Sequence, residues 1–583
     1  MKCLARLIVL ASVVVFACGQ MALGTTYFVS SVDQLRNTMN NNASPGDTIR
    51  VMPGSYNSRL WVSGVHGLPG NMINIIAHDP ANRPVFSSDA PACFTLNDCS
   101  YIMVDGIIAE HGGTPTQDAN NIEFPNSNHM IIKNSVSRDM DHDGNSDAYK
   151  FAQSNNILMY NCVAENWADG GAGVDGMVSN SSLFMRNTIT FPTLPDYAGA
   201  IGIMPKGGAY HHGMYKNHFI DGSSRAICFG GSGGAVGPEI YDSVAMGNLI
   251  EAGEAAVAYV SSEECEFSYN TVINPEKYVM RILKEGAVGA SDCTFKRNII
   301  EYGNVTVQNI GSGNDPASFT YQENYWYKWT NPGGSIPTLA SPEIDPAGGV
   351  DPQLDSDGRP HYAGAKDYGR YAPQMESEFE QYAPWFQWAW DEAQAFEPKA
   401  EAGGLYRVGP GGAVRFDGSA SYAGVGSYGA HSIGNYLWDI DWDSDFDDGV
   451  GQTVDLTYAN LAGMGLGSGE HTVELAISVA NEYNTIWDWG FAELDIVDLR
   501  GDADGDGLVD GLDYVAWSNS YPLSDVDWIG GDFNGDRLAD GLDYVIWSNN
   551  YSVPGAPVPE PGVCMLLAVG ALLGGVRRRR AAR

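Results

Sequence analysis

A short pattern recurs through the first half of the chain: an apolar or small stretch, an asparagine, and then an aliphatic or aromatic residue. A period of this length, 22 to 31 residues, is typical of solenoids, in which each turn buries its apolar strand against its neighbours. The strands alternate with period two and are rich in β-branched residues, so the chain is predicted to form a β-solenoid. The pattern is centred on Asn134, Asn161, Asn187, Asn217, Asn248, Asn270, Asn298 and Asn324, with Asp105 one period earlier.

The solenoid is predicted to span residues 25–330. Residues 32–39 indicate a short helix that caps its open end, because an uncapped end would expose unpaired backbone groups. Residues 48–51, in the stretch PGDTIRV, are predicted to form the strand that begins the coils. This opening resembles that of secreted right-handed parallel β-helix proteins that act on polysaccharides. The resemblance implies an all-β fold in which the asparagines form an inward ladder and are architectural.

The pattern ends near residue 330, and residues 331–399 are predicted to close the solenoid. The stretch DPQLDSDGRPHYAGAKDYGRYAP resembles the tail that closes such β-helices. Residues 376–397, with Trp385, Trp388 and Trp390, indicate a short helix or packing linker. An aromatic platform for sugars is the alternative interpretation of these tryptophans.

Residues 400–498 form short alternating strands separated by Gly, Asp and Ser turns, which predicts an antiparallel β-sandwich. The stretches AGGLY, FDGSAS, YLWD and HTVEL resemble those of a PKD domain. The resemblance implies a spacer or a weak ligand-binding module, so no catalytic residue is expected there.

Two near-duplicate segments, DADGDGLVDGLDYVAWSNSY and DFNGDRLADGLDYVIWSNNY, lie within residues 499–553. Their spacing wraps oxygen ligands around a hard cation and predicts two Ca²⁺ sites, with the two leucines offering backbone carbonyls. A solvated acidic turn would not explain why the whole loop repeats. In the second loop Arg537 replaces the usual glycine at position 6, which is expected to weaken that site. The predicted ligands at positions 1, 3, 5, 7, 9 and 12 are Asp502, Asp504, Asp506, Leu508, Asp510 and Asp513, then Asp532, Asn534, Asp536, Leu538, Asp540 and Asp543.

Each loop is followed by one predicted helix, at residues 514–520 and 544–550. Tandem loop–helix pairs with Asp at position 12 resemble a type I dockerin. The resemblance implies a cohesin-like partner, with the duplicated Tyr-Val-x-Trp-Ser-Asn as the docking face.

Both ends of the chain carry targeting patterns. Residues 1–24 have a positive start, an apolar core and a small-residue cleavage site, which is typical of a signal peptide. Residues 554–583 contain VPEP, a short apolar run and four arginines, and resemble a PEP-CTERM sorting signal with a short transmembrane segment. We therefore expect an exported protein, extracellular or on the surface of a bacterium with a Gram-negative-type envelope, that meets a C-terminal sorting machinery.

The net charge of −39, from 71 acidic and 32 basic residues, argues against non-specific nucleic-acid binding. Six cysteines fall within the solenoid, and their spacing matches no zinc pattern. We expect them to be small apolar residues of the interior. A disulfide between Cys93 and Cys99 is the alternative in an exported protein.

Aligning the turns on their asparagines places several polar residues in one phase. Lys150, Asp175 and Lys206 are predicted to form a strip along the wall, about 4.8 Å per turn. Asp169 and Arg225 are predicted to form a second strip. Glycine-rich stretches flank both strips, which would let a ligand approach the backbone closely.

These strips suggest a polysaccharide lyase, in which a base removes the proton next to a uronate carboxylate and a cation neutralises that carboxylate. Lys206, with its pKa lowered by a neighbouring cation, and Arg225 are the candidates for these roles, and His211, beside His212, is a further candidate for proton transfer. The stretch PKGGAYHHGMYKNHFIDGSSR partly resembles the Lys…Asn…Arg stretch of family 6 polysaccharide lyases, the chondroitinase B and alginate lyase group. That family carries acidic calcium ligands before its lysine, whereas this chain has GAIGIMP, so the calcium-assisted mechanism does not transfer directly.

Two other functions remain open. A glycoside hydrolase would use Asp169 and Asp175 as its carboxylate pair, about 5 to 9.5 Å apart. A non-catalytic surface rod that binds polysaccharide or acts as an adhesin needs neither set of residues.

Overall fold

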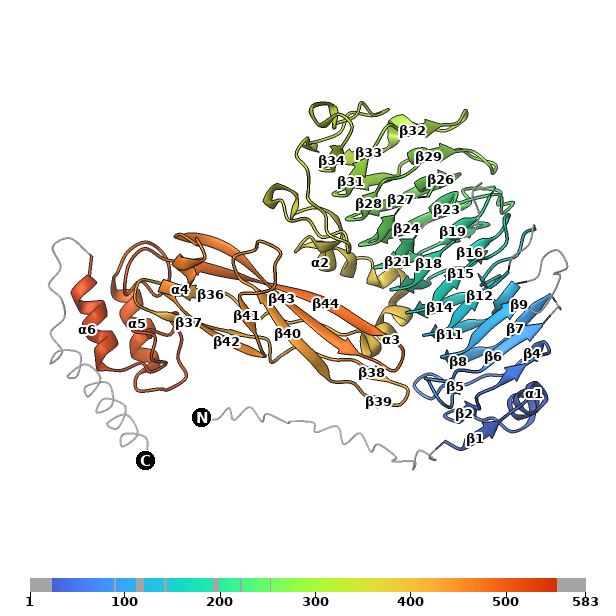
Figure 1. Ribbon diagram of the computed structural model, residues 1–583, viewed down its shortest axis with the longest axis horizontal. Helices are drawn as coiled ribbons and strands as arrows, with labels where there is room; N and C mark the ends of the chain where they lie inside the picture. Colours follow the sequence, from blue (N-terminus) through green and yellow to red (C-terminus); the bar gives the residue numbers. More distant parts are fainter. Residues whose placement is uncertain are drawn as a thin grey trace, which may run out of the picture.

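The computed structural model describes residues 24–88, 91–111, 120–140, 144–191, 199–220, 223–251 and 253–552. A stack of parallel coils is followed by a helical segment, a second sheet unit and a pair of C-terminal helices (Figure 1). The expected signal peptide and sorting segment, including its short transmembrane run, lie outside the described residues except at Gly24. Within the described ranges, no helix is long and apolar enough to cross a membrane.

The coils build three parallel sheets, S1, S2 and S3, which confirms the predicted β-solenoid. S1 contains β1 (Thr26–Val29), β2 (Thr48–Val51), β5 (Ile73–Ala77), β8 (Ser100–Asp105), β11 (Asn128–Lys133), β14 (Asn155–Tyr160), β17 (Leu183–Met185), β20 (Ala209–Tyr210), β21 (Gly213–Tyr215), β24 (Ile240–Met246), β27 (Ser262–Ser268), β30 (Thr294–Lys296) and β33 (Thr320–Gln322). S2 contains β3 (Ser55–Tyr56), β6 (Val85–Ser88), β9 (Ile108–His111), β12 (Val136–Arg138), β15 (Val163–Glu165), β18 (Thr188–Thr190), β22 (His218–Ile220), β25 (Leu249–Glu251), β28 (Thr271–Ile273), β31 (Ile299–Tyr302), β34 (Tyr325–Lys328) and β35 (Ala347–Gly348). S3 contains β4 (Leu60–Ser63), β7 (Ala92–Asn97), β10 (Asn120–Glu123), β13 (Tyr149–Lys150), β16 (Ala172–Met177), β19 (Ile201–Lys206), β23 (Arg225–Gly230), β26 (Ala255–Val260), β29 (Tyr278–Leu283) and β32 (Thr306–Ile310).

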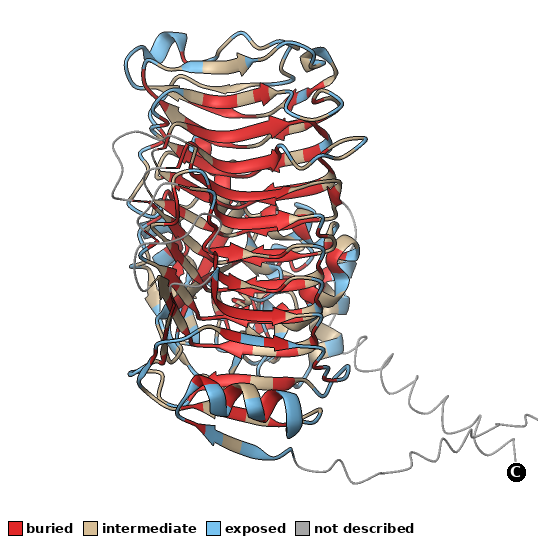
Figure 2. Cartoon of the chain, turned by 90° about the vertical axis from the view of Figure 1, so that its right-hand side faces the viewer, coloured by how far each residue is buried: buried red, intermediate tan, exposed pale blue. Residues whose placement is uncertain are grey.

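Apolar residues of the three sheets form one continuous buried core, and Figure 2 shows buried residues along the stacked strands of the coils. The helix α1 (Val32–Asn41) covers the first coil, as predicted. Ser31 caps its N-terminus, and Leu35 and Met39 bury against the core beneath. The end of the stack is therefore closed by an amphipathic helix instead of an open strand edge.

The inward asparagine ladder begins at Asn187, which corrects the alignment made from the sequence. The strand pairing Val136↔Val163↔Thr188 makes Cys162, and not Asn161, equivalent to Asn187. Asn134 and Asn161 instead occupy left-handed corners, with φ of 51° and 53°. Asparagine tolerates that conformation better than most residues, so the same residue type serves two different positions.

From Asn187 onward, each ladder amide donates to the carboxamide oxygen of the next turn, at distances of 2.8–3.2 Å. The last rung ends on a carboxylate, because Glu343 accepts the backbone N–H and Nδ2 of Asn324 at 3.0 and 2.8 Å. Glu343 also accepts the indole N–H of Trp326 at 2.8 Å. Every ladder amide thus has a partner, as buried polar groups require. The ladder consists of Asn187, Asn217, Asn248, Asn270, Asn298 and Asn324.

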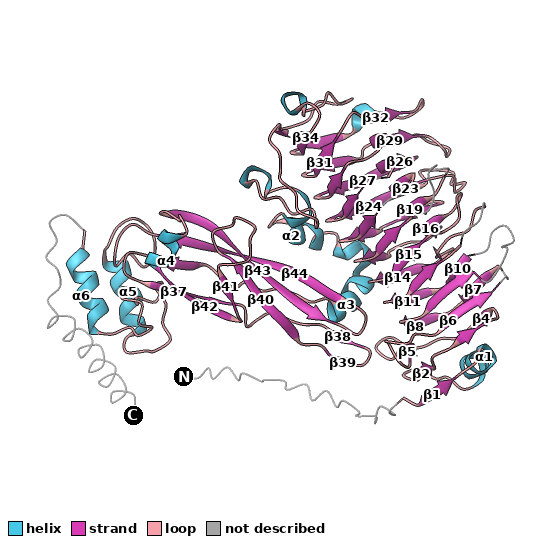
Figure 3. Cartoon of the chain, in the orientation of Figure 1, coloured by secondary structure: helices cyan, strands magenta, loops and turns pink. Residues whose placement is uncertain are grey.

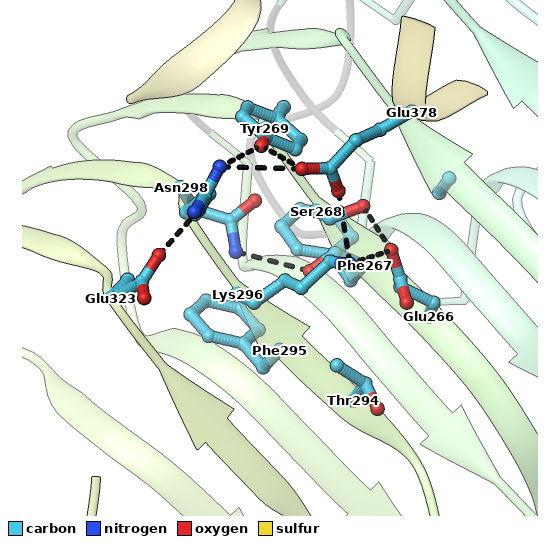
Figure 4. Close-up of polar contacts among 12 residues, drawn as sticks. Glu266, Phe267, Ser268, Tyr269, Thr294, Phe295, Lys296, Asn298, Glu323 and Glu378 are labelled. Atoms are coloured by element: carbon cyan, nitrogen blue, oxygen red, sulfur yellow. Dashed lines mark hydrogen bonds and ion pairs between the residues drawn. The ribbon is translucent and has the colours of Figure 1, made fainter. Parts of the chain in front are cut away.

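A closing segment runs back along the outer face of S1. Its helices bury Phe379, Phe386 and Trp390 in a shared apolar cluster with S1 side chains. Figure 4 shows Glu378 bonded to the Tyr269 hydroxyl at 2.6 Å and to Lys296 at 3.1 Å. The segment contains η2 (Pro332–Gly334), η3 (Ala363–Ala365), η4 (Gly369–Tyr371), α2 (Met375–Glu380), η5 (Ala383–Phe386) and α3 (Gln387–Phe396), whereas η1 (Pro316–Ser318) lies within the coils between β32 and β33.

The three tryptophans of this segment act mainly as packing residues. Trp390 is buried, Trp385 stacks on His211 with ring centroids 5.4 Å apart, and Trp388 meets His129 edge-on at 5.0 Å. This geometry favours the packing linker over the sugar platform.

The second sheet unit is built around a long antiparallel hairpin (Figure 3). Its five-stranded sheet follows the order β36, β44, β43, β40, β41, and two small sheets pair β37 with β42 and β38 with β39. Its elements are β36 (Tyr406–Val408), β37 (Ala413–Asp417), β38 (Val425–Gly426), β39 (Gly429–Ala430), β40 (Ile433–Asp439), β41 (Gly449–Val450), β42 (Thr453–Thr457), α4 (Tyr458–Gly463), β43 (Gly469–Ala480) and β44 (Thr485–Ile496).

The helix pair, α5 (Gly511–Ser520) and α6 (Gly541–Asn550), shares one apolar core with the second sheet unit. Trp528 joins the two, because its buried ring packs directly on Gly409 and Gly412 of the second sheet unit. A Cβ added to either glycine would lie only 2.4–2.5 Å from the ring. Both helices begin three residues earlier than predicted, since Asp510 and Asp540 cap them.

Buried charges join the solenoid to the second sheet unit. Arg186 of the solenoid donates to Asp488 of β44 at 2.8 Å and forms an ion pair with Glu397. Lys216, one turn further, also reaches Asp488, at 2.9 Å. These four side chains are no more than 10% exposed, so the contact is desolvated and its groups depend on one another.

The cysteines of the described coils are buried and form no disulfide with one another. Cys93 and Cys99 are both buried, and Cys93 lies 3.5 Å from the amide oxygen of Asn121. The structure therefore contains no disulfide between Cys93 and Cys99. The cysteines are interior residues, as predicted from the sequence. The six are Cys93, Cys99, Cys162, Cys228, Cys265 and Cys293.

Candidate functional site

The outer face of S3 carries the predicted strip of charges. Lys150 of β13 and Asp175 of β16 are directly paired across neighbouring strands, and Lys150 Nζ lies 3.2 Å from Asp175 Oδ2. Asp147, three residues before Lys150, also binds this ammonium, at 2.7 Å. One lysine is therefore held between two carboxylates.

Lys206 joins this group although it is out of register. It pairs with Met177, two residues beyond Asp175, because the turns differ in length. Its long side chain still brings Nζ to 3.6 Å from Asp175 Oδ2 and 3.9 Å from the Met204 sulfur. The structure thus brings Lys150, Asp175 and Lys206 into contact, and the nearest charged partner of Lys206 is a carboxylate and not the cation expected from the sequence.

Arg225 lies on the same stretch of wall, one turn further along. Its guanidinium is 2.9 Å from Glu285 Oε1 and 3.7 Å from the Cys228 sulfur. The pairing of Ile203 with Ile227 in the two strands puts Met204 beside Cys228, about 4.8 Å apart. Lys206 and Arg225 therefore cover two neighbouring side chains of S3 and face the same side.

The site is nearly neutral at rest, because each cation has a carboxylate. Burial raises the pKa of Asp147 to about 6, and the charge of Asp175 acts in the same direction. Burial opposes protonation of Lys150, but Asp147 and Asp175 outweigh it and raise the pKa of that ammonium. Glu285 likewise contributes to raising the pKa of Arg225 against the effect of burial.

Asp175 has an unused acceptor. Its side chain is 4% exposed, and its Oδ1 has no hydrogen-bond partner among the described residues. A buried carboxylate oxygen without a hydrogen-bond partner is costly, so this atom remains available as an acceptor for the hydroxyl of a bound molecule.

The other candidates lie elsewhere. Asp169 is half-buried in the turn before β16, on the same coil as Asp175, whereas Arg225 is in register with Ala172 through Ile201. Among the described residues, no hydrogen bond or ion pair joins Asp169 to Arg225, which contacts Glu285 and Cys228 instead, so these two residues do not form the predicted second strip.

The two histidines are also remote from the lysines. His211 sits at a left-handed corner beside S1, between Tyr210 and Trp385, and burial lowers its pKa. His212 is wholly buried against Phe184, and burial lowers its pKa to about 4. The geometry gives neither ring access to the Lys206 side of the wall.

Three residues around the strip were not assigned a role from the sequence. Asp147 fixes Lys150, Glu285 holds Arg225, and Ser232 donates to Glu285 at 3.2 Å. In the sequence, these residues are marked only by their closeness to the charged and glycine-rich stretches. Their contacts cross between turns and depend on the loop lengths, which the repeat pattern does not predict.

The first acidic loop gathers three carboxylates around one point. In the first loop, carboxylate oxygens of Asp502, Asp504 and Asp506 lie within 4.8 Å of one another. This spacing fits ligands at 2.3–2.6 Å from one ion. In the second loop Arg537 adopts φ of 67° and its side chain forms an ion pair with Asp525, so the residue that replaces glycine is accommodated in the left-handed turn.

The remaining predicted ligands surround the same loops. Asp510 and Asp540 cap the helices, while Asp513 and Asp543 are buried and accept backbone N–H groups of their own loops. Burial raises the pKa of Asp513 and of Asp543 to about 6. A bound cation would relieve this desolvation, so the residues present fit Ca²⁺.

Comparison with known proteins gives only distant similarities. No family model matches the chain, and no curated protein matches it. Among solved structures, it is similar to an alginate lyase from Paenibacillus sp. (16% identity, 50% of this chain and 97% of that one, TM-score 0.34). It is also similar to a PL6 family polysaccharide lyase from Pseudopedobacter saltans (13%, 59% and 99%, TM-score 0.34) and an endo-xylogalacturonan hydrolase from Aspergillus tubingensis (9%, 56% and 100%, TM-score 0.34). At this level of similarity they carry no argument about the site.

Proposed function

We propose that the protein degrades an acidic polysaccharide by β-elimination on the outer face of S3. The observation that carries the proposal is that Lys206 and Arg225 cover neighbouring side chains of one wall and each has a carboxylate beside it. A long flat wall suits an extended polymer, and exposed loops on either side suit its positioning.

In this reaction Arg225 would bind the uronate carboxylate, for which its guanidinium must leave Glu285. The bound charge makes the neighbouring C–H more acidic. Lys206, in its neutral form, would take that proton, and the electron pair would form a C=C bond as the glycosidic C–O bond breaks. The leaving oxygen would keep the C–O bonding pair and take a proton from water. Asp175, whose Oδ2 lies 3.6 Å from Lys206 Nζ, would orient the ammonium that results.

A second candidate is hydrolysis, and one observation favours it. Asp147 Oδ2 and Asp175 Oδ2 both contact Lys150 Nζ, at 2.7 and 3.2 Å. The two oxygens are therefore at most about 6 Å apart, close to the separation of about 5–5.5 Å in retaining glycosidases. Asp147 is 1% exposed and both of its oxygens are bonded, which is why we rank this reaction second.

The experiment incubates the purified protein with a panel of uronate-containing polysaccharides. Elimination produces an unsaturated uronate, detected by ultraviolet absorbance, whereas hydrolysis releases reducing ends without that absorbance. Lys206→Met and Arg225→Met are each expected to reduce cleavage about a hundredfold or more, and Arg36→Met on the capping helix serves as the control. Binding of the polymers without either product would contradict both reactions and favour the adhesin.

We further infer that the helix pair is a dockerin that takes one Ca²⁺ in each acidic loop and binds a cohesin-like partner. The support is the duplicated loop, the clustered carboxylates of Asp502, Asp504 and Asp506, and the helices that follow. The calcium ions would order the loops and take no part in the chemistry at Lys206.

We also propose that the second sheet unit is a PKD module and that the chain is exported and sorted. The residues that support this are the PKD-like stretches of 400–498, the signal-like residues 1–24 and the VPEP segment with its terminal arginines. In that arrangement the protein would act outside a Gram-negative-type cell, on a polymer of its surroundings.

A further inference from the structure

Glu239, which directly precedes β24, has a wholly buried side chain. Its carboxylate accepts four backbone N–H groups: Oε2 from Gly207 and Gly233 at 2.8 and 2.9 Å, and Oε1 from Gly234 and Ala235 at 2.9 and 3.0 Å. Consecutive N–H groups that converge in this way form an anion-binding nest. The anion in this nest is a side chain of the protein itself.

The four donors come from two different loops. Gly207 directly follows Lys206, while residues 233–235 belong to the loop after β23, the strand that begins with Arg225. Oε2 is the atom that bridges them. The fit is close, since a Cβ on Gly233 would lie 2.3 Å from Oε2 and 2.4 Å from the Gly207 nitrogen. Only glycine permits this approach.

A third loop meets the same carboxylate. A Cβ on Gly286 would lie 2.9 Å from Glu239 Cγ, so the loop that carries Glu285, which follows β29 two strands beyond β23 in S3, packs on Glu239. Ser232, in the loop that Glu239 holds, donates to Glu285 Oε2 at 3.2 Å, and Glu285 Oε1 holds Arg225. The backbone of Lys206 and the ion pair of Arg225 are thus linked through one buried side chain.

Among the described residues, no Lys, Arg or His forms an ion pair with Glu239, so backbone N–H groups are its only hydrogen-bond donors in that part of the chain. Only a carboxylate offers enough acceptor positions for four N–H groups from two loops. The carboxylate therefore sets the distance between the loops, and with it the distance between the two cations.

We propose that Glu239 is a positioning residue that sets the placement of Lys206 and of the Arg225–Glu285 pair. Its consequence for catalysis rests on the proposed β-elimination, but the placement itself is measurable without a substrate.

The test compares Glu239→Gln with the wild-type protein. Glutamine keeps one acceptor oxygen and turns an NH₂ group toward two of the four N–H donors, so it cannot keep both the bridge to Gly207 and the bonds within the second loop. The matched control is Glu343→Gln, another carboxylate that accepts three N–H groups but closes the asparagine ladder far along the chain. If Glu239→Gln does not fold, Glu239→Asp retains the charge on a stem that is one methylene shorter.

Two readouts need no substrate. Hydrogen exchange of the peptide that contains Gly207 or Gly233 is expected to accelerate about tenfold or more in Glu239→Gln. The pH profile for acylation of Lys206 by an amine reagent is expected to shift relative to that of Lys150, measured by mass spectrometry. Neither change is expected in Glu343→Gln. On a uronan that the wild type cleaves, kcat/KM should fall about tenfold or more.

The proposal is overturned if exchange at both loops is unchanged in Glu239→Gln. It is also overturned if exchange accelerates while the acylation profile of Lys206 stays that of the wild type, because Glu239 would then only stabilise the loops. If the wild type cleaves no uronan, the proposed function fails, and the exchange and acylation results still decide the role of Glu239.

Discussion

Replacing Asn248 with alanine removes the centre of the buried ladder. Asn248 Oδ1 accepts the backbone N–H and the Nδ2 of Asn217 at 2.9 and 3.0 Å, and its own Nδ2 donates to Asn270 at 2.8 Å. Alanine would leave two donors of Asn217 buried without an acceptor. At about 1–3 kcal/mol for each orphaned group, the solenoid should lose about 2–6 kcal/mol of unfolding free energy.

The matched variant is Asn161→Gly. Asn161 lies at a left-handed corner that glycine adopts readily, its partner Asn484 is exposed, and its buried partner Asn134 keeps its bond to Asp105 at 2.8 Å. We expect this change to cost only about 1 kcal/mol. Urea unfolding followed by far-ultraviolet circular dichroism gives both values, and hydrogen exchange at the Asn217 amide reports the ladder locally. If both variants lost the same free energy of unfolding, the distinction between corner asparagines and ladder asparagines would be refuted.

Three further predictions concern the rest of the chain. Calorimetry is expected to find two Ca²⁺ per molecule, one of them lost in Asp504→Ala, and chelation should lower the melting temperature of the helix pair; an unchanged stoichiometry would contradict this. Asp488→Asn removes the carboxylate that Arg186 and Lys216 share, and it should lower the free energy of unfolding by about 3–5 kcal/mol, measured by thermal unfolding. A negligible loss would show that the junction is solvated. Burial, aided by Glu474, raises the pKa of Asp439 to about 7. Because the folded state then holds its proton more tightly than the unfolded state, the second sheet unit should lose about 1.4 kcal/mol of stability per pH unit between about pH 4 and 7, and Asp439→Asn should flatten that slope.

The solenoid was predictable because its physics is local and repeated. Each turn needs an apolar strand, a corner and a buried polar rung, so the pattern at Asn187 returns in every later turn. The register between Asn161 and Asn187 was not predictable from the pattern, because asparagine suits both the corner and the rung. The sequence pattern does not reveal a register shift of one residue when asparagine occupies the corner in some turns and the adjacent rung in others.

The candidate site was predictable only in part. Lys150 and Asp175 were placed correctly because they lie on strands whose separation follows the period. Lys206 reaches the same carboxylate through the length of its side chain, despite an offset of two residues. The contacts of Glu239 and Glu285 depend on how three loops of unequal length fold over one another, and no periodicity encodes that.

The core that the helix pair shares with the second sheet unit has a mechanical consequence. A force applied to α5 and α6 would be transmitted through Trp528 to the strands of the second sheet unit, because the two parts pack together in one apolar core. If the helix pair were held by a stationary partner, the S3 side of the coils would point in one fixed direction relative to that partner. The orientation of the attached helix pair would then determine which molecules in the surroundings can contact the S3 face.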